Sequence, residues 1–217
     1  MIGSDGFGFG WFAADDREPA RYRSTLPIWV DENVDTMSPH LRSTCIVASS
    51  RTASREMPVA MTNTPPFDFG GALLVHNGAI HDFHETVLEP LRAQLSVETR
   101  ARILGNTDTE YIAALLRERT GDLAARVRET IGMITAAIRD ARVRGQLNLI
   151  VASGDELVAT RHAVDDDVPS LWMRASADSF TVASEPMEEN DGWSEIPAGT
   201  LITVRRGSAP VETRIAA

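Results

Sequence analysis

The stretch Asp5-Gly6-Phe7-Gly8-Phe9-Gly10-Trp11-Phe12 alternates aromatic side chains with glycine. Alternation with a period of two is typical of a β-strand, and glycine inside a strand marks a place where another part of the chain approaches the backbone closely. The stretch lacks the Gly-Lys-Ser/Thr ending of a phosphate-binding loop. We therefore predict a strand over Phe7–Phe12 with one face packed against a close neighbour.

Further strands are predicted by short apolar runs that are bounded by Gly, Pro, Asn and Asp. Two of them, Cys45–Ser49 and Ala72–His76, have the length of buried strands. The C-terminal third predicts three antiparallel hairpins, each with turn residues between its strands. Their paired ranges are 147–152 with 157–160, 171–176 with 180–184, and 201–205 with 211–215.

Helices are predicted in the middle of the chain. Apolar residues recur at helical spacing over His81–Leu95, where we expect Pro90 to kink or divide the helix. Thr107 and Glu110 have the spacing of a capping box, and a second long apolar stripe begins after Asp122. Strands first, helices in the middle and hairpins last predict a layered α+β fold with segregated helices and sheets.

The composition argues against several classes of protein. The chain has 217 residues, a formal net charge of -10 and one cysteine, Cys45, so an internal disulfide and a multi-cysteine zinc site are excluded. The acidic balance argues against nucleic acid, and the lack of a long apolar run argues against a membrane span. No secretory signal is visible, so we expect a cytoplasmic protein. We also expect no cofactor and no metal. All 21 basic residues are arginine, which we interpret as coding bias.

Four short motifs stand out together, although each alone is weak evidence. They are Asp5–Phe12, Ser50–Ser54, His76-Asn77-Gly78 and Asn106–Glu110. In this order and at this spacing they resemble the class II glutamine amidotransferases, a branch of the N-terminal-nucleophile hydrolases. The tail strengthens the resemblance through the stretches 147–149, 159–161 and 183–186, followed by Gly192-Trp193 and Pro197. Within the family, the γ-glutamyl hydrolases of ergothioneine biosynthesis are favoured by the stretches 21–24, 27–29 and 65–67.

The resemblance implies one glutamine amidotransferase type-2 domain over residues 1–217. Its fold would be a four-layer αββα sandwich of two antiparallel sheets flanked by helices. The family carries a cysteine directly after the initiator methionine, whereas Ile2 follows Met1 here. We therefore expect that the chain begins late in the family pattern and lacks the nucleophilic cysteine and the first strand. A sheet without that strand has an open edge, so we expect residues 1–217 alone to be poorly soluble or to self-associate.

The resemblance also implies a site for a γ-glutamyl amide. Arg51 suits the α-carboxylate as a planar bidentate donor, and Asp108 suits the α-ammonium. His76 is implied to bind substrate, and the side-chain amide of Asn77 and the backbone N–H of Gly78 are implied to form the oxyanion hole. The alternatives are a surface arginine at 51, an acidic residue in a first helical turn at 108, and a tight hairpin turn at Asn77-Gly78.

The nucleophile would be a thiolate whose own α-amine accepts its proton. Cys45 has no free α-amine, and we expect it to be a small buried residue of a strand. A trimethylammonium group on the substrate would be attracted by aromatic faces. Candidates for such a pocket, with core packing as the alternative, are Trp11, Phe12, Trp29 and Phe67.

Three functions stay open on these grounds. The first is hydrolysis of a γ-glutamyl amide through a cysteine thioester, in ergothioneine biosynthesis. The second is a glutaminase module that delivers ammonia to a partner synthase, and the third is a non-catalytic remnant that binds a γ-glutamyl ligand. The implied partner is a small-molecule γ-glutamyl substrate, with a homo-oligomer or a partner synthase in addition.

Overall fold

The structure, a computed structural model, describes residues 3–13, 18–54, 57–188 and 192–215. The chain divides into two compact units. The first comprises Met1–Val75, Leu95–Glu118 and Val151–Asp155, and the second comprises His76–Gln94, Arg119–Ile150 and Glu156–Ala217. Met1 and Ile2, on which the expectation of a late start depends, lie outside the described residues.

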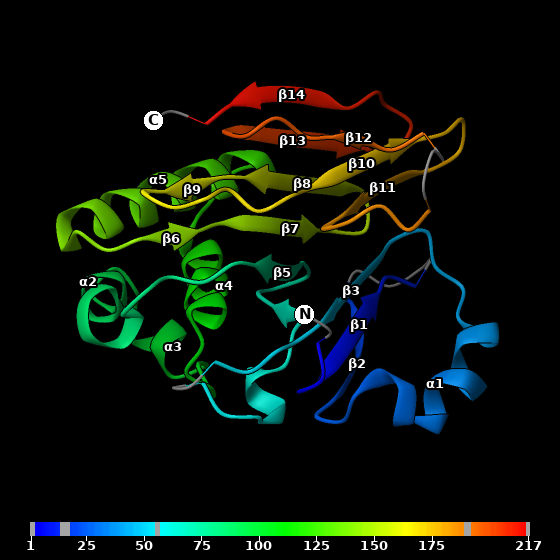
Figure 1. Cartoon of the computed structure of the whole chain (residues 1–217), viewed down its shortest axis with the longest axis horizontal. Coiled ribbons are helices and arrows are strands. Elements are labelled where there is room, and N and C mark those ends of the chain that lie inside the picture. Colours follow the sequence, from blue (N-terminus) through cyan, green and yellow to red (C-terminus); the bar gives the residue numbers. More distant parts are fainter. Residues whose placement is uncertain (1–2, 14–17, 55–56, 189–191, 216–217) are drawn as a thin grey trace. The chain divides into compact units, whose positions relative to one another are not determined.

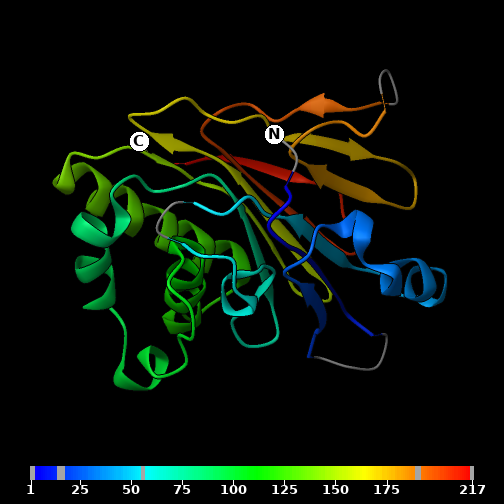
Figure 2. The same ribbon diagram turned by 60° about the horizontal axis from the view of Figure 1, so that its bottom comes forward.

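The first unit contains a three-stranded antiparallel sheet with β1 (Phe7–Trp11) between β2 (Ala20–Ser24) and β3 (Ile46–Ser50) (Figure 1). Helix α1 (Glu32–Met37) lies beside β2 in both views (Figures 1 and 2), and the Tyr22 hydroxyl donates to the Asp31 carboxylate at its N-cap at 2.8 Å. The other elements of this unit are 3₁₀ helices at Ile28–Val30, Ser38–His40 and Met61–Asn63, strand β4 (Phe67–Asp68) paired with the start of β5 (Leu73–Asn77), and helices α3 (Val97–Arg100) and α4 (Asp108–Glu118).

In the second unit, β14, β13, β8 and the start of β7 lie side by side in that order. Helix α5 (Leu123–Ala141) packs against β8 and buries the apolar stripe predicted for it. A second sheet has the strand order β11-β10-β12, and β6 pairs with β9. The bounds of these strands are β6 (Gly145–Gln146), β7 (Asn148–Ala152), β8 (Glu156–Arg161), β9 (Ala163–Val164), β10 (Trp172–Ala175), β11 (Phe180–Ala183), β12 (Ser194–Glu195), β13 (Thr200–Arg205) and β14 (Val211–Arg214).

The predicted mixture of antiparallel sheets and helices is confirmed. The three expected hairpins are β7–β8, β10–β11 and β13–β14, and the expected strands β1, β3 and β5 agree with the predicted bounds to within one residue. The four-layer αββα arrangement and the single domain over residues 1–217 stay predictions.

The region predicted as a helix over 81–95 is divided, but not at Pro90. A π-helical turn, Phe83–Val87, is followed by α2 (Leu88–Arg92), in which Pro90 is the third residue. The N–H groups of a first helical turn have no partner inside an α-helix. Proline at this position therefore leaves no α2 hydrogen bond unmade.

The predicted capping box at α4 is half formed. The Thr107 hydroxyl accepts the Glu110 N–H at 3.1 Å, as expected. The Glu110 carboxylate does not return to Thr107 but accepts the N–H groups of Leu104 at 2.9 Å and Gly105 at 2.7 Å. Burial raises the pKa of Glu110, and these two hydrogen bonds lower it in opposition. Glu110 therefore fixes the loop that leads into α4.

Two glycines allow other parts of the chain to approach β1. A Cβ on Gly8 would lie 2.2 Å from the Pro65 carbonyl oxygen, and a Cβ on Gly10 would lie 2.4 Å from a methyl carbon of Leu73. Both distances are far inside van der Waals contact, so the closely packed face predicted from the alternation is confirmed. In the sheet register, Gly8 lies opposite Arg23 and Gly10 opposite Arg21.

Within the part of the chain that the structure describes, no helix combines the length and apolarity needed to cross a bilayer.

Because a methyl group at position 8 would meet a backbone carbonyl, we expect Gly8→Ala to lower the free energy of unfolding by about 1–3 kcal/mol. Gly132→Ala is the matched control, since a Cβ there, on the exposed side of α5, meets no atom within 4 Å. We expect this control to raise stability by about 0.5–1 kcal/mol through helix propensity. Urea denaturation measures both, and a Gly8→Ala midpoint equal to that of the wild type would contradict the close approach.

Candidate functional site

Arg51 directly follows β3, and its backbone is fixed by the segment that precedes β1. The Arg51 N–H donates to the Gly6 carbonyl at 2.8 Å, and the Asp5 N–H donates to the Arg51 carbonyl at 2.9 Å. Its guanidinium donates to the carbonyls of Met57 and Pro58, the latter at 3.1 Å. The side chain is therefore a positioned, half-buried cation that also holds the loop at 57–58.

Asp108 is the first residue of α4 and is buried, with 4% of its surface exposed. One carboxylate oxygen accepts the N–H of Thr109 at 2.6 Å and its hydroxyl at 3.2 Å. Burial lowers the pKa of Arg51, and the charges of Asp5 and Asp108 raise it in opposition. The first unit therefore brings Arg51 and Asp108 into one electrostatic environment.

Asn63 joins the surroundings of these two residues, although no sequence motif indicates it. Its amide nitrogen donates to Pro58 at 3.0 Å and to the Asn106 side chain at 2.8 Å. Its amide oxygen accepts the Asn106 N–H at 3.0 Å. Asn63 is 3% exposed and ends the 3₁₀ helix Met61–Asn63, 43 residues from Asn106, so no local spacing could have identified it.

Asp5 is a second residue whose role the motif alone did not indicate. Its carboxylate accepts the Ala53 N–H at 2.8 Å, and its own N–H pairs with Arg51. Asp5 thereby holds both Arg51 and the segment that follows it. Its position within the Asp-Gly-Phe-Gly motif was the available signal.

His76, Asn77 and Gly78 belong to the second unit, where they lie next to β6. His76 Nε2 lies 2.7 Å from the Gln146 carbonyl oxygen. Gly78 has φ +149°, and a Cβ there would lie 2.3 Å from the same oxygen. The chain then continues into the Ile80 bridge with Gly145 rather than into an antiparallel return strand. The hairpin-turn alternative for Asn77-Gly78 is therefore wrong, and both residues are solvent-exposed.

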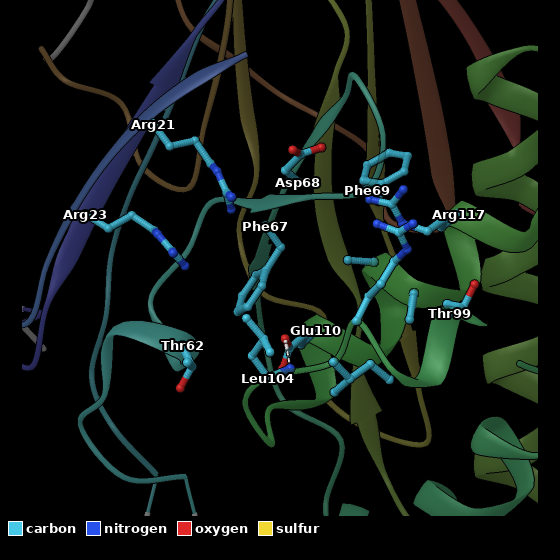
Figure 3. Close-up of a pocket in the computed structure, with 14 residues that line it drawn as sticks. Arg21, Arg23, Thr62, Phe67, Asp68, Phe69, Thr99, Leu104, Glu110 and Arg117 are labelled. Atoms are coloured by element: carbon cyan, nitrogen blue, oxygen red, sulfur yellow. Dashed lines mark hydrogen bonds between the residues drawn. The ribbon is translucent and has the colours of Figure 1, made fainter. Parts of the chain in front are cut away.

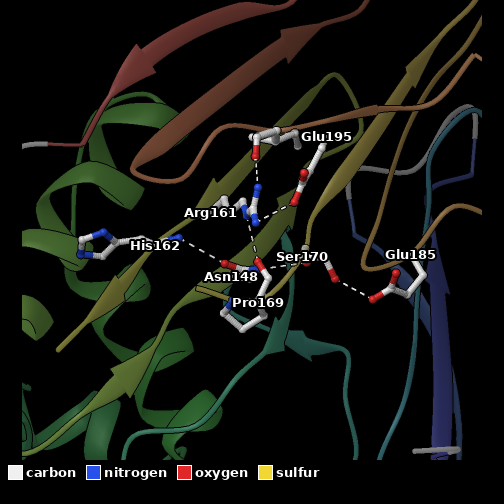
Figure 4. Close-up of polar contacts among 8 residues, drawn as sticks. Asn148, Arg161, His162, Pro169, Ser170, Glu185 and Glu195 are labelled. Carbon is white, nitrogen blue, oxygen red and sulfur yellow. Dashed lines mark hydrogen bonds and ion pairs between the residues drawn. The ribbon is translucent and has the colours of Figure 1, made fainter. Parts of the chain in front are cut away.

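The tail motifs at 147–149, 159–161 and 183–186 supply a polar scaffold in the second unit (Figure 4). Arg161 donates to the carbonyls of Pro169, at 2.9 Å, and Ile196, and forms a 2.8 Å ion pair with Glu195. Asn148 donates to the carbonyls of Pro169 and Ser170 at 3.0 and 3.1 Å. Each of the three guanidinium nitrogens has a partner in its own chain, so this motif stabilises the loops around β8 and β10.

The structure also shows where the cysteine and the candidate aromatic residues lie. Cys45 lies just before β3 and is partly exposed, so the expectation of a buried strand residue is wrong. Phe12 is 3% exposed, whereas Trp29 is 59% exposed on a 3₁₀ helix. Phe67 lines a cavity together with four arginines, an environment that disfavours a trimethylammonium group.

Comparisons with known proteins show which family the chain resembles. A family model described as class II glutamine amidotransferases matches residues 2–173. A gamma-glutamyl-hercynylcysteine sulfoxide hydrolase from Mycobacterium tuberculosis is 34% identical over 204 residues, which cover 94% of this chain and 76% of that protein. The protein of the same name from Mycolicibacterium smegmatis is 31% identical over 205 residues, covering 94% and 79%.

Solved structures show the same fold. A glutamine aminotransferase class-II domain protein from Silicibacter pomeroyi superimposes with a TM-score of 0.79 at 24% identity, over 100% of this chain and 95% of that one. Glutamine phosphoribosylpyrophosphate amidotransferase from B. subtilis gives 0.73 at 17% identity, over 99% of this chain and 44% of that one. With a family model that matches most of its length and relatives above 30% identity, the chain belongs to the class II glutamine amidotransferases.

Proposed function

We propose that this chain binds the glutamyl part of a γ-glutamyl amide and hydrolyses its amide bond, as the name of its mycobacterial relatives indicates for them. The observation that carries the proposal is the pair formed by Arg51 and Asp108. One is a half-buried cation and the other a buried carboxylate, and each is close enough to feel the charge of the other.

The opposite charges match the zwitterionic end of glutamate. Two of the five N–H groups of a guanidinium are engaged with Met57 and Pro58 among the described residues, which leaves donors for an α-carboxylate. Asp108 would accept from the α-ammonium. Hydrogen bonds to charged groups contribute about 1.5–3 kcal/mol each, which is enough to orient the amide.

The reaction needs donors for the oxyanion that forms when the amide carbon is attacked. In the proposal these are the side-chain amide of Asn77 and the N–H of Gly78, with His76 among the substrate-binding residues. Gln146 supports this assignment, because its carbonyl lies 2.7 Å from His76 Nε2 and its N–H donates to the carbonyl of Ala79, next to Gly78, at 2.9 Å. One such donor typically stabilises the transition state by about 2.7–4 kcal/mol.

The proposed route is a cysteine thioester. A thiolate attacks the γ-carbonyl carbon, the C–N bond breaks as the leaving amine takes a proton, and water then cleaves the thioester to release glutamate. The step needs a cysteine with a free α-amine, and Cys45, the one cysteine among the 217 residues, lies inside the chain. Cys45 therefore does not meet this requirement, and the proposal assigns the step to the cysteine that the family carries directly after its initiator methionine.

Glutamate release separates the candidate functions. The assay compares the 217-residue chain with a version extended to an in-frame upstream Met-Cys start, on a γ-glutamyl cysteine sulfoxide and on L-glutamine. Faster release from the sulfoxide supports the proposal, whereas a preference for glutamine favours a glutaminase module. Binding of L-glutamate without release by either version, or an upstream stop codon, favours a non-catalytic remnant.

Asp108→Asn removes the negative charge offered to the α-ammonium. We expect the dissociation constant for L-glutamate to rise at least tenfold, since about 1.5–3 kcal/mol is lost. Asp140→Asn, an exposed carboxylate on α5, is the control and should leave the dissociation constant unchanged. Isothermal titration calorimetry measures both, and equal affinity in the two variants would refute the role of Asp108.

Asn63→Ala tests the positioning role of the loop bridge. Three hydrogen bonds are lost at a buried site. We therefore expect the free energy of unfolding to fall by about 1–3 kcal/mol and the affinity for glutamate to fall as well. Asn33→Ala removes an exposed amide of the same unit, which water can replace, and should have a smaller effect on both. Lower stability with unchanged glutamate affinity would show that Asn63 does not position the Arg51–Asp108 pair.

A further inference from the structure

A cavity of about 400 Å³ lies within the first unit and is lined by four arginines (Figure 3). Arg21 and Arg23 enter from β2, and Arg117 enters from α4 on the other side (Figure 3). The volume is within the range of small-molecule sites. Neither Arg51 nor Asp108 lines it, so the cavity is a separate feature of the unit.

The two carboxylates of the cavity offset its four arginines only in part, although the charges of Glu110 and Arg23 do act on each other. Both oxygens of Glu110 accept backbone N–H groups of the loop at 104–105, and Asp68 accepts the Gly70 N–H at 2.8 Å. Among the described residues neither carboxylate forms an ion pair with a lining arginine, and Arg102 pairs with Glu98, outside the cavity, at 3.2 Å. The cavity therefore keeps an excess of positive charge.

Arg21 and Arg23 hold like charges next to each other. They alternate on β2 and so point to the same face of the sheet, opposite Gly10 and Gly8. Each is anchored through one guanidinium nitrogen, Arg21 to the Pro66 carbonyl at 3.1 Å and Arg23 to the carbonyls at 61 and 64 at 3.1 Å. Burial lowers the pKa of Arg23, the charge of Arg21 lowers it further, and the charge of Glu110 raises it in opposition. Such repulsion would be relieved by an anion between them.

Arg117 gives the strongest indication that the cavity binds an anion. It is half-buried, and it forms no hydrogen bond or ion pair with any residue that the structure describes. Its guanidinium lies against Gly70, where a Cβ would be 3.2 Å from one of its nitrogens. A partly desolvated guanidinium without an acceptor is unfavourable, whereas a planar array of donors suits a carboxylate or phosphate.

Part of the remaining wall is apolar, beside the hydroxyl-bearing side chains of Thr62 and Thr99. Phe67 and Phe69 are 5% and 2% exposed, and both line the cavity. A ligand that fills the space would therefore combine a charged end with an aromatic or aliphatic body.

We propose that this cavity binds a small molecule with a compact oxyanion, a phosphate or a carboxylate, held by Arg21, Arg23 and Arg117, and with an apolar part against Phe67 and Phe69. The site takes no part in the proposed amide hydrolysis, and it stands on the charge and shape of the cavity alone.

Calorimetric titration of the 217-residue chain with phenyl phosphate, benzoate and inorganic phosphate tests the proposal, at an ionic strength held constant because salt screens charge. We expect saturable binding of phenyl phosphate or benzoate with a dissociation constant below about 1 mM. The tighter of the two identifies the oxyanion, and inorganic phosphate should bind more weakly than phenyl phosphate. Absence of saturable binding by phenyl phosphate and benzoate would overturn the proposal.

Arg117→Gln should weaken binding at least tenfold, and Arg117→Lys should weaken it less, because it keeps the charge but loses the fork of donors. Arg92→Gln, an exposed arginine on α2 paired with Glu89, is the control and should bind as the wild type does. Thermal melts without ligand show whether each variant folds, and Arg21→Gln replaces Arg117→Gln if the latter does not. Equal affinities in the folded cavity variant and in Arg92→Gln would place the anion elsewhere and refute the site.

Discussion

The first unit depends on the backbone of β1 lying against its neighbours with no side chain between them. At Gly8 and Gly10 a single methyl group would collide with Pro65 or Leu73. This close approach governs how β2 and β3 pair with β1. That pairing positions both the candidate site at Arg51 and the arginine cavity. On one side β3 pairs with β1 and delivers Arg51; on the other, β2 places Arg21 and Arg23 opposite the two glycines.

Much of the fold could be predicted because its signals are local. Hairpins have turn residues at fixed positions, and α5 has an apolar stripe over its whole length. Strand β2 was missed because Ala-Arg-Tyr-Arg-Ser carries no apolar alternation, and its stability comes from pairing with β1. The division of the helix after His81 falls at Val87 rather than at Pro90, since a proline in the first turn of α2 breaks nothing.

The candidate site also contains residues that the sequence predicted and residues that it did not. Arg51 and Asp108 could be named because they occur within recognisable motifs. Asn63 could not, because its partners are brought to it by folding across 43 residues. The arginine cavity was hidden for two further reasons. Its arginines come from three separate places, namely β2, the loop that follows α3, and helix α4. The all-arginine composition had also been interpreted as coding bias. A comparison of Arg161 with Arg117 shows how structure separates the roles. Arg161 donates to backbone carbonyls and pairs with Glu195 of its own unit, whereas Arg117 has no such contact among the described residues.

Helix α4 carries Asp108 at its first residue and Arg117 nine residues later, about 14 Å away along the axis. A ligand whose binding at Arg117 shifted α4 along its axis would also shift the carboxylate at the other end. Thermodynamic reciprocity would then require that a ligand at Asp108 change the affinity at Arg117 by the same factor.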